Sequence, residues 1–239
     1  MALRNTKFSG IKWLIPVVLA ATMPTMAATE SVGAHYPPVE QATFHQLVFA
    51  NDDVAILINR YPPGGNSDFH LHPRDLFFVT VTPSLTSAQR LGQPLSPPRQ
   101  QPAGIVGYNV MGSEPFIHRV INNGDAPALF VAIEIRRAAP MAGALTERGG
   151  GYVQILDNSR LRAWRVVLEP GQSLPALTQR ANGVRVVVRG GLLRTSRPGI
   201  ADQVLALESG NVAWQQAGET RALSNAGTTP IELVEMELK

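Results

Sequence analysis

Apolar residues along this chain occur in short runs that are separated by glycine, proline and asparagine. Some runs alternate apolar and polar residues and others are almost wholly apolar, patterns typical of half-buried and fully buried β-strands. Residues 83–103 are rich in proline, glutamine and serine, and this composition predicts a loop. The first half shows no amphipathic helical period, so its pattern predicts a sandwich or barrel of short strands. The expected strands are residues 43–49, 54–58, 76–81, 105–110, 116–121 and 128–135.

The second half of the chain repeats the first. Residues 168–171 correspond to 61–64, 184–188 to 77–81, and 224–230 to 121–127, while Gly210 is matched to Gly107. Alanine, proline, arginine and three consecutive glycines lie between the copies. The repeat predicts one β module at residues 40–136, a linker at 137–151 and a second module at 152–239.

The N-terminus has the pattern of a secretory signal peptide, residues 1–27. Arg4, Lys7 and Lys12 precede the apolar residues 13–21, and small side chains stand at the two positions that a signal peptidase reads, Thr25 and Ala27. The apolar run is short for a bilayer span, which takes about 20 residues, so we expect no stable membrane span after cleavage; an uncleaved anchor is the alternative. Export of a chain with no cysteine is compatible with a bacterial periplasm.

Two histidines separated by one residue are the strongest chemical signal. On a β-strand His70 and His72 point to the same side, where two imidazoles can bind one divalent metal ion if a third ligand, His118, arrives from elsewhere. In the second copy the aligned residues are Leu177, Gln179 and Arg221. The fold therefore does not require the histidines, which points to a functional role.

Arg221 replaces a candidate ligand, so we expect it to face inward and line a cavity. A buried arginine needs an anionic partner, either Glu169 or a bound carboxylate. His35 and His45 lie outside the motifs and are predicted to be surface residues. The formal net charge of +3 is small and scattered, and it predicts no nucleic-acid partner.

These motifs resemble those of the cupin superfamily, and the chain after residue 27 resembles a bicupin. Gly64 or Gly65 leads into His70 and His72 as in the first cupin motif; the second motif is matched by Gly107 or Gly112, Pro115, His118 and Asn122. The resemblance implies an all-β fold of two tandem antiparallel jelly-roll barrels, with the metal inside the mouth of the first. Asn225 retains the asparagine in the second copy, so we assign Asn122 to the turn before Gly124.

One cupin ligand is missing, because the glutamate of the first motif should fall at Leu76 or Phe77. Asp75 is a candidate fourth ligand if a bulge at Pro73 redirects it. The alternative is a site of three histidines, which resembles the cupin thiol dioxygenases and the diketone-cleaving dioxygenase that hold ferrous iron. Tyr108 either lines the cavity or packs in the core.

Two functions follow from this site. The first is an exported metal-binding bicupin that acts as a non-haem iron dioxygenase-like enzyme on a small organic substrate; the second is a non-catalytic cupin that binds a small ligand or metal. Iron is the first choice of metal, with zinc, manganese and nickel as alternatives. The sequence identifies no general acid or base, so the catalytic residues stay unassigned. Either a monomer or a homodimer is compatible with two cupin modules in one chain.

Overall fold

The fold is all-β. The computed structural model describes residues 36–111, 116–137 and 148–239, in which the only helix is a single 3-10 turn, Val39–Gln41. Within these ranges no helix has the length and apolarity needed to cross a membrane. The predicted signal peptide, most of the predicted linker, and Gly112 and Pro115 of the second motif lie outside the described residues.

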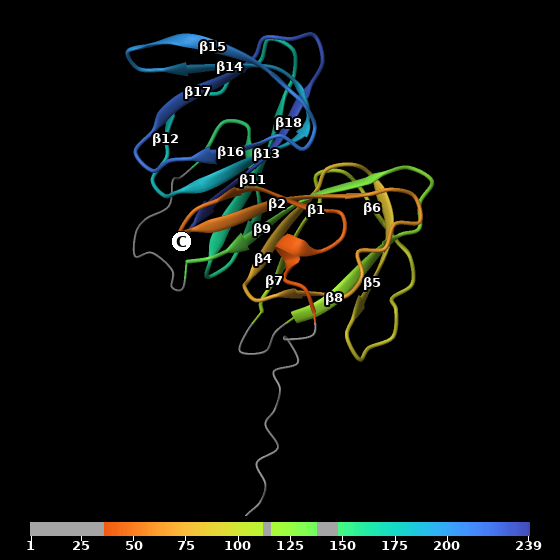
Figure 1. Ribbon diagram of the computed structural model, residues 1–239. Coiled ribbons are helices and arrows are strands. Elements are labelled where there is room, and N and C mark those ends of the chain that lie inside the picture. The colour runs from red at the N-terminus through yellow and green to blue at the C-terminus, as the bar shows by residue number, and fades with distance from the viewer. Residues whose placement is uncertain (1–35, 112–115, 138–147) are drawn as a thin grey trace, which may run out of the picture. The chain divides into compact units, whose positions relative to one another are not determined.

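The N-terminal domain consists of two antiparallel sheets that face each other (Figure 1). The five-stranded sheet has the order β1-β2-β9-β4-β7 and the four-stranded sheet the order β3-β8-β5-β6. The strands are β1 His45–Ala50, β2 Val54–Tyr61, β3 His70–His72, β4 Leu76–Thr80, β5 Ser84–Arg90, β6 Arg99–Gln101, β7 Val106–Asn109, β8 Phe116–Asn122 and β9 Ala128–Ile135.

The C-terminal domain repeats this arrangement. Its sheets have the orders β10-β11-β18-β13-β16 and β12-β17-β14-β15, which match the first domain strand for strand. The all-β, two-domain prediction is therefore confirmed. The strands are β10 Tyr152–Asp157, β11 Leu161–Leu168, β12 Leu177–Thr178, β13 Gly183–Arg189, β14 Gly191–Arg197, β15 Ile200–Leu207, β16 Val212–Gln215, β17 Thr220–Asn225 and β18 Ile231–Leu238.

Side chains on β2 alternate between two faces of the sheet, one packed in an apolar core and the other directed at a cavity. Val54, Ile56 and Ile58 belong to an apolar core that also contains residues of β11, β13 and β18, so the five-stranded sheets of the two domains share one core. The rings of Phe49 and Trp214 stack within it at 5.7 Å. Asn59 is on the opposite face of β2, where it lines a cavity inside the N-terminal domain.

A repeated asparagine network closes the same turn in both domains. The Asn122 side chain donates to the carbonyls of Tyr61 and Ala126 and accepts from the Gly124 amide. This confirms that Asn122 serves the turn. Asn225 makes the equivalent bonds to Leu168, Thr229 and Gly227.

The structure corrects two sequence expectations. Residues 83–103 are not a loop, because they contain β5 and β6, which extend the sheet that carries the histidines. Gly210 corresponds to Gly104 rather than Gly107: both have positive φ, and their amides donate to the equivalent carbonyls of Val187 and Thr80. Gly107 instead lies inside β7, where the Phe78 ring leaves no room for a Cβ atom.

Candidate metal centre

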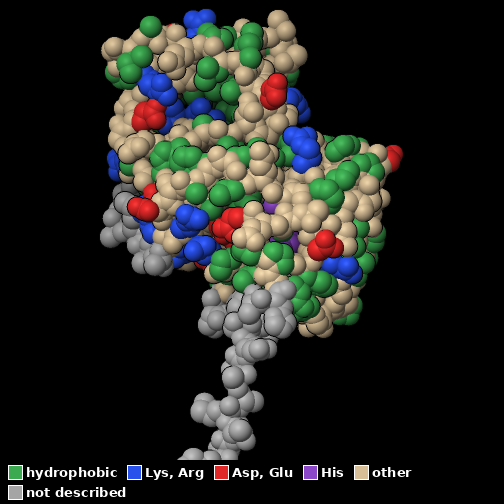
Figure 2. Space-filling model, in the orientation of Figure 1, with side chains coloured by type: hydrophobic (Ala, Val, Ile, Leu, Met, Phe, Trp, Pro, Cys, Tyr) green, Lys and Arg blue, Asp and Glu red, His purple; other side chains and the backbone are tan. Residues whose placement is uncertain are grey.

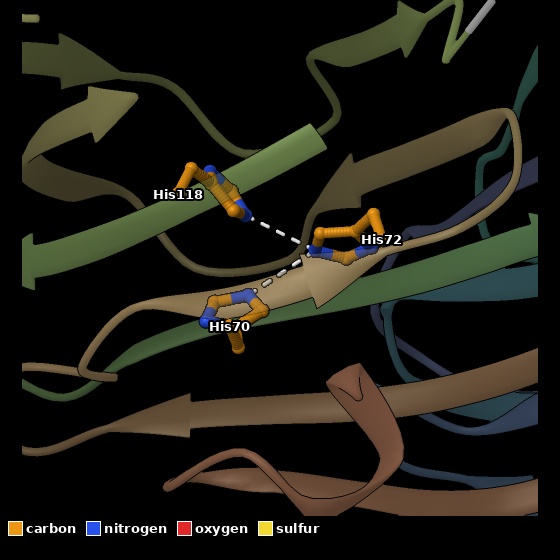
Figure 3. A group of neighbouring side chains, drawn as sticks. All are labelled: His70, His72 and His118. Carbon is orange, nitrogen blue, oxygen red and sulfur yellow. Dashed lines mark hydrogen bonds between the residues drawn. The ribbon is translucent and has the colours of Figure 1, made fainter. Parts of the chain in front are cut away.

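Three histidines meet on the inner face of the four-stranded sheet. β3 and β8 pair antiparallel with His70 directly opposite His118, and His72 follows two residues later on the same face of β3. Figure 3 shows the three rings directed toward one another. The Nε2 atom of His72 lies 3.1 Å from that of His70 and 3.0 Å from that of His118. His70 and His72 are fully buried and His118 is partly buried.

Hydrogen bonds behind the rings fix how two of them are protonated. The Nδ1 atom of His70 is 3.0 Å from the carbonyl oxygen of Asp68, which can only accept, so this nitrogen carries the proton. The Nδ1 of His72 likewise donates to the Glu134 carboxylate at 3.2 Å. Each neutral ring then presents an Nε2 lone pair to the other. Two lone pairs at 3.1 Å repel unless a cation lies between them, and this arrangement suits a metal site.

The nitrogen separations agree with a single ion. Ligand nitrogens about 2.1 Å from one metal and about 90° apart are separated by about 3.0 Å, close to the two measured distances. One ligand atom from each histidine lies within 4.8 Å of the others. The described residues thus offer three imidazoles to a divalent transition metal, and the remaining coordination positions would be open to exogenous ligands.

Burial keeps the triad uncharged. It lowers the pKa of His118 to about 3, with further lowering by His70 and His45. Burial, followed by the repulsion of His118 and His70, holds the pKa of His72 well below its usual value, and burial also lowers that of His70. The neutral form is the one that binds metal, so protons do not compete with a metal for this site near neutral pH.

Glu134 is a site residue that the sequence analysis missed. It is on β9, far from the histidine motif in sequence, and its carboxylate supports His72 from behind. Burial raises its pKa to about 7, with a smaller rise from Glu40 and opposing effects of Arg74 and Arg136. A single charged residue inside an otherwise apolar strand, at an inward position, is the signal that could have revealed it.

Asp75 lies in the segment between β3 and β4, and its carboxylate has other partners. One oxygen accepts the Tyr108 hydroxyl at 2.6 Å and the other accepts the Met111 amide at 3.0 Å. Arg160 of the C-terminal domain lies 3.7 Å away. The structure therefore gathers the three histidines without Asp75. Tyr108 packs on the face of β7 that adjoins the shared core, opposite Asn109, which lines the cavity.

His72 and His118 of the triad line a cavity of about 290 Å³ between the two sheets of the N-terminal domain. Figure 2 shows histidine only as small patches on the visible face of this domain, as expected for side chains recessed below the surface. The wall is mainly apolar and aromatic, with a few neutral polar groups. The lining residues are His45, Asn59, Tyr61, His72, Leu76, Phe78, Thr86, Ala88, Gln101, Asn109, Phe116, His118, Val120, Phe130 and Ala132.

His45 is part of this wall, which corrects its assignment to the surface. Its ring lies 4.6 Å from that of His70, and burial together with His70 lowers its pKa to about 4. Its Nδ1 donates to the Thr43 carbonyl, so its Nε2 accepts the Tyr61 hydroxyl at 3.2 Å. His45 was not recognised because its strand is exposed at most other positions. His35 lies outside the described residues.

The equivalent place in the C-terminal domain holds an ion-pair cluster. Leu177 pairs with Arg221 as His70 pairs with His118, so the strand register supports the alignment of the two copies. Arg221 faces inward and is 2 % exposed; its partners are Gln179 and Glu235, whereas Glu169 is exposed. Arg148 and Arg185 also bind Glu235, and Arg148 binds Glu237. Buried ion pairs thus fill the position that the histidines occupy in the first domain.

Comparisons with known proteins identify the fold. No protein family model and no curated protein matches the sequence. The structure of AerE from Microcystis aeruginosa aligns with 83 % of this chain and 98 % of its own, at 11 % identity and a TM-score of 0.59. Salicylate 1,2-dioxygenase from Pseudaminobacter salicylatoxidans aligns with 82 % of this chain and 76 % of its own, at 13 % identity and a TM-score of 0.56. A cupin 2 conserved barrel domain protein from Leptotrichia buccalis aligns with 82 % of this chain and 88 % of its own chain, at 12 % identity and a TM-score of 0.51.

The chain therefore has a cupin fold in each half, and its histidine triad is in the N-terminal half. More particularly, its arrangement of two cupin folds in one chain resembles the fold of the salicylate dioxygenase. That dioxygenase has also been solved as adducts with gentisate.

Proposed function

We propose that this protein is a metal-dependent enzyme of the non-haem iron dioxygenase type that acts on a small organic molecule. The observation that carries the proposal is the convergence of three neutral imidazoles, two with their Nδ1 protons held from behind, on one point of a cavity. Three protein ligands leave coordination positions open, as catalytic metal sites do and closed structural sites do not.

The chain's own residues would hold the metal and orient the imidazole rings rather than transfer protons. His70, His72 and His118 would hold the metal, while Asp68 and Glu134 keep the first two rings in register. When iron is bound, it supplies a centre on which a substrate oxygen and dioxygen can be neighbours. The apolar wall, including Phe78, Phe116 and Phe130, would exclude water from that centre.

Iron is favoured over zinc, manganese and nickel by the likeness of fold to a salicylate 1,2-dioxygenase. The cavity volume of about 290 Å³ suits a molecule built on a single aromatic ring. A non-catalytic cupin that stores a metal or small ligand is the second candidate, favoured by the described cavity lining, which includes no aspartate or glutamate that could serve as a general acid or base. The export and periplasmic location predicted by residues 1–27 are part of the proposal.

Oxygen consumption distinguishes the two candidates. Protein reconstituted anaerobically with ferrous iron is mixed with aerated catechol, salicylate, gentisate or a 1,3-diketone, and oxygen uptake is compared with that of the His118→Ala variant. Substrate-dependent uptake that the variant lacks supports the enzyme. Iron-loaded protein that consumes no oxygen with any of these compounds, yet binds them at equilibrium, supports the non-catalytic candidate.

A further inference from the structure

The described part of the metal cavity wall offers no counter-charge to a charged ligand. Among the described lining residues there is no lysine, arginine, aspartate or glutamate. Apart from the histidines, its polar members are asparagine, glutamine, threonine and tyrosine, whose side chains carry no charge. A charge placed here, away from a metal, would meet no counter-ion.

The charged residues near the cavity lie outside its lining. Glu134 is behind the His72 ring and is held there by the Nδ1 proton. Arg90 is exposed at the end of β5, where its guanidinium lies 5.6 Å from the centre of the Phe116 ring. Arg74 faces Glu134 at 3.7 Å. None of the three therefore lines the space into which the triad opens.

Neutral hydrogen-bonding groups are available on two sides of the same space. Asn59, which is 6 % exposed, lies on β2 beside His45 and Tyr61, and its Oδ1 atom has no hydrogen-bond partner. Across the cavity, Gln101 donates to the Thr86 hydroxyl, which is left with its own proton to donate. Uncharged hydroxyl or carbonyl groups of a ligand can bind to such groups without the cost of burying a charge.

We infer that the cavity selects a small ligand whose only charged or metal-binding atoms lie at the triad and whose remaining body is neutral, apolar and at most hydroxyl- or carbonyl-substituted. This inference rests on the proposed function for the metal end of the ligand. It assigns the specificity for the end of the ligand that lies away from the metal to the lack of a counter-charge among the described lining residues. An aromatic diol or an enol would meet this description, whereas a dicarboxylate would not.

The test uses three probes that share one metal-binding group. Benzohydroxamic acid, 4-hydroxybenzohydroxamic acid and 4-carboxybenzohydroxamic acid differ only at the ring position opposite the hydroxamate. Their affinities for the iron-loaded protein are measured by isothermal titration calorimetry. We expect the hydroxyl probe to bind at least as tightly as the parent and the carboxyl probe to bind at least about tenfold more weakly, because its second charge is buried without a partner.

A charge introduced into the wall should reverse this preference. Ala88 lines the cavity yet is exposed on β5, so Ala88→Lys places an ammonium group at the wall with little risk to folding. We expect it to recover most of the affinity for the carboxyl probe. The matched control is Gln89→Lys, the next residue on the same strand, whose side chain contacts Arg119 rather than the cavity. This control should leave all three affinities unchanged.

The possible outcomes are distinct. A carboxyl probe that binds wild-type protein within threefold of the parent overturns the inference, as does an equal gain in Ala88→Lys and Gln89→Lys. If iron does not bind, the metal-binding part of the proposed function fails, and metal-free protein titrated with phenol and benzoate then decides the present inference alone. Binding of phenol at least about tenfold tighter supports it, and equal or tighter binding of benzoate overturns it.

Discussion

A single substitution at Glu134 should change the metal affinity of the protein without lowering its stability. Glu134→Gln keeps the shape of the side chain and, above the pKa of about 7, removes the charge that accepts the proton of His72 Nδ1, which lies 3.2 Å from the carboxylate oxygen. The amide can also turn its NH₂ group toward Nδ1, which would shift the ring proton to Nε2 and block the metal-binding lone pair.

Glu134→Gln should weaken metal binding but should not lower the stability of the metal-free protein. Loss of such a supporting hydrogen bond weakens metal binding by about 10- to 100-fold, or about 1.4 to 2.7 kcal/mol. The metal-free protein should not be destabilised, because Glu134 is fully buried, its Oε2 lacks a hydrogen-bond partner and Arg74 is 3.7 Å away. Removing a poorly compensated buried charge is neutral or stabilising.

The assay pairs two measurements on the same samples. Metal affinity is obtained by competition with a chelator, and the free energy of unfolding of the metal-free protein by urea denaturation. Glu40→Gln is the matched control, because Glu40 acts on Glu134 through its charge and lies 4.0 Å from Arg136. Unchanged metal affinity in Glu134→Gln, or a loss accompanied by an equal loss of stability, would refute the supporting role.

Three further predictions concern the scaffold. Asn225→Ala removes the side-chain hydrogen bonds to the Leu168 and Thr229 carbonyls and from the Gly227 amide. It should lower the free energy of unfolding by about 2–3 kcal/mol in urea titrations, without changing metal affinity. Burial alone would raise the pKa of Glu235, but Arg185, Arg221 and Arg148 outweigh it and hold that pKa below 4.5. Glu235→Gln should therefore lower the free energy of unfolding by about 3–5 kcal/mol at pH 7. This difference in stability from wild type is present above pH 4.5 and should shrink when the urea titrations are repeated at lower pH. The shared core predicts one cooperative calorimetric transition for both domains, and Trp214→Ala should lower its midpoint; two separate transitions in wild type would contradict this.

The apolar pattern predicted the strands that form the core, because burial dictates which residues they contain. Residues 128–135 and 54–58 were found this way, and both belong to the N-terminal five-stranded sheet, which packs in the core shared by the two domains. β5 was missed because its inward residues are small or polar, such as Thr86 and Ala88, which line a cavity instead of filling a core. Its pairing with β8, rather than its composition, makes it a strand.

The candidate site was predictable to the extent that its residues are close in sequence or repeated. His70 and His72 are two residues apart, and the replacement of these two and of His118 in the second copy pointed to a functional role for all three. Glu134 and His45 reach the triad only through the closure of the five-stranded sheet over the four-stranded one. No local pattern encodes that closure, so their roles depend on the three-dimensional structure.

The most direct test of the metal centre is the metal content of the purified protein. Elemental analysis of protein prepared without added metal should find about one transition-metal ion per chain, as expected for one triad per chain. His72→Ala should lose the metal. Arg221→Gln, which alters the ion-pair cluster at the equivalent place in the second domain, should retain it when folded. Wild-type protein that contains no metal and binds none on reconstitution, or a His72→Ala variant that keeps a full complement, would contradict the account.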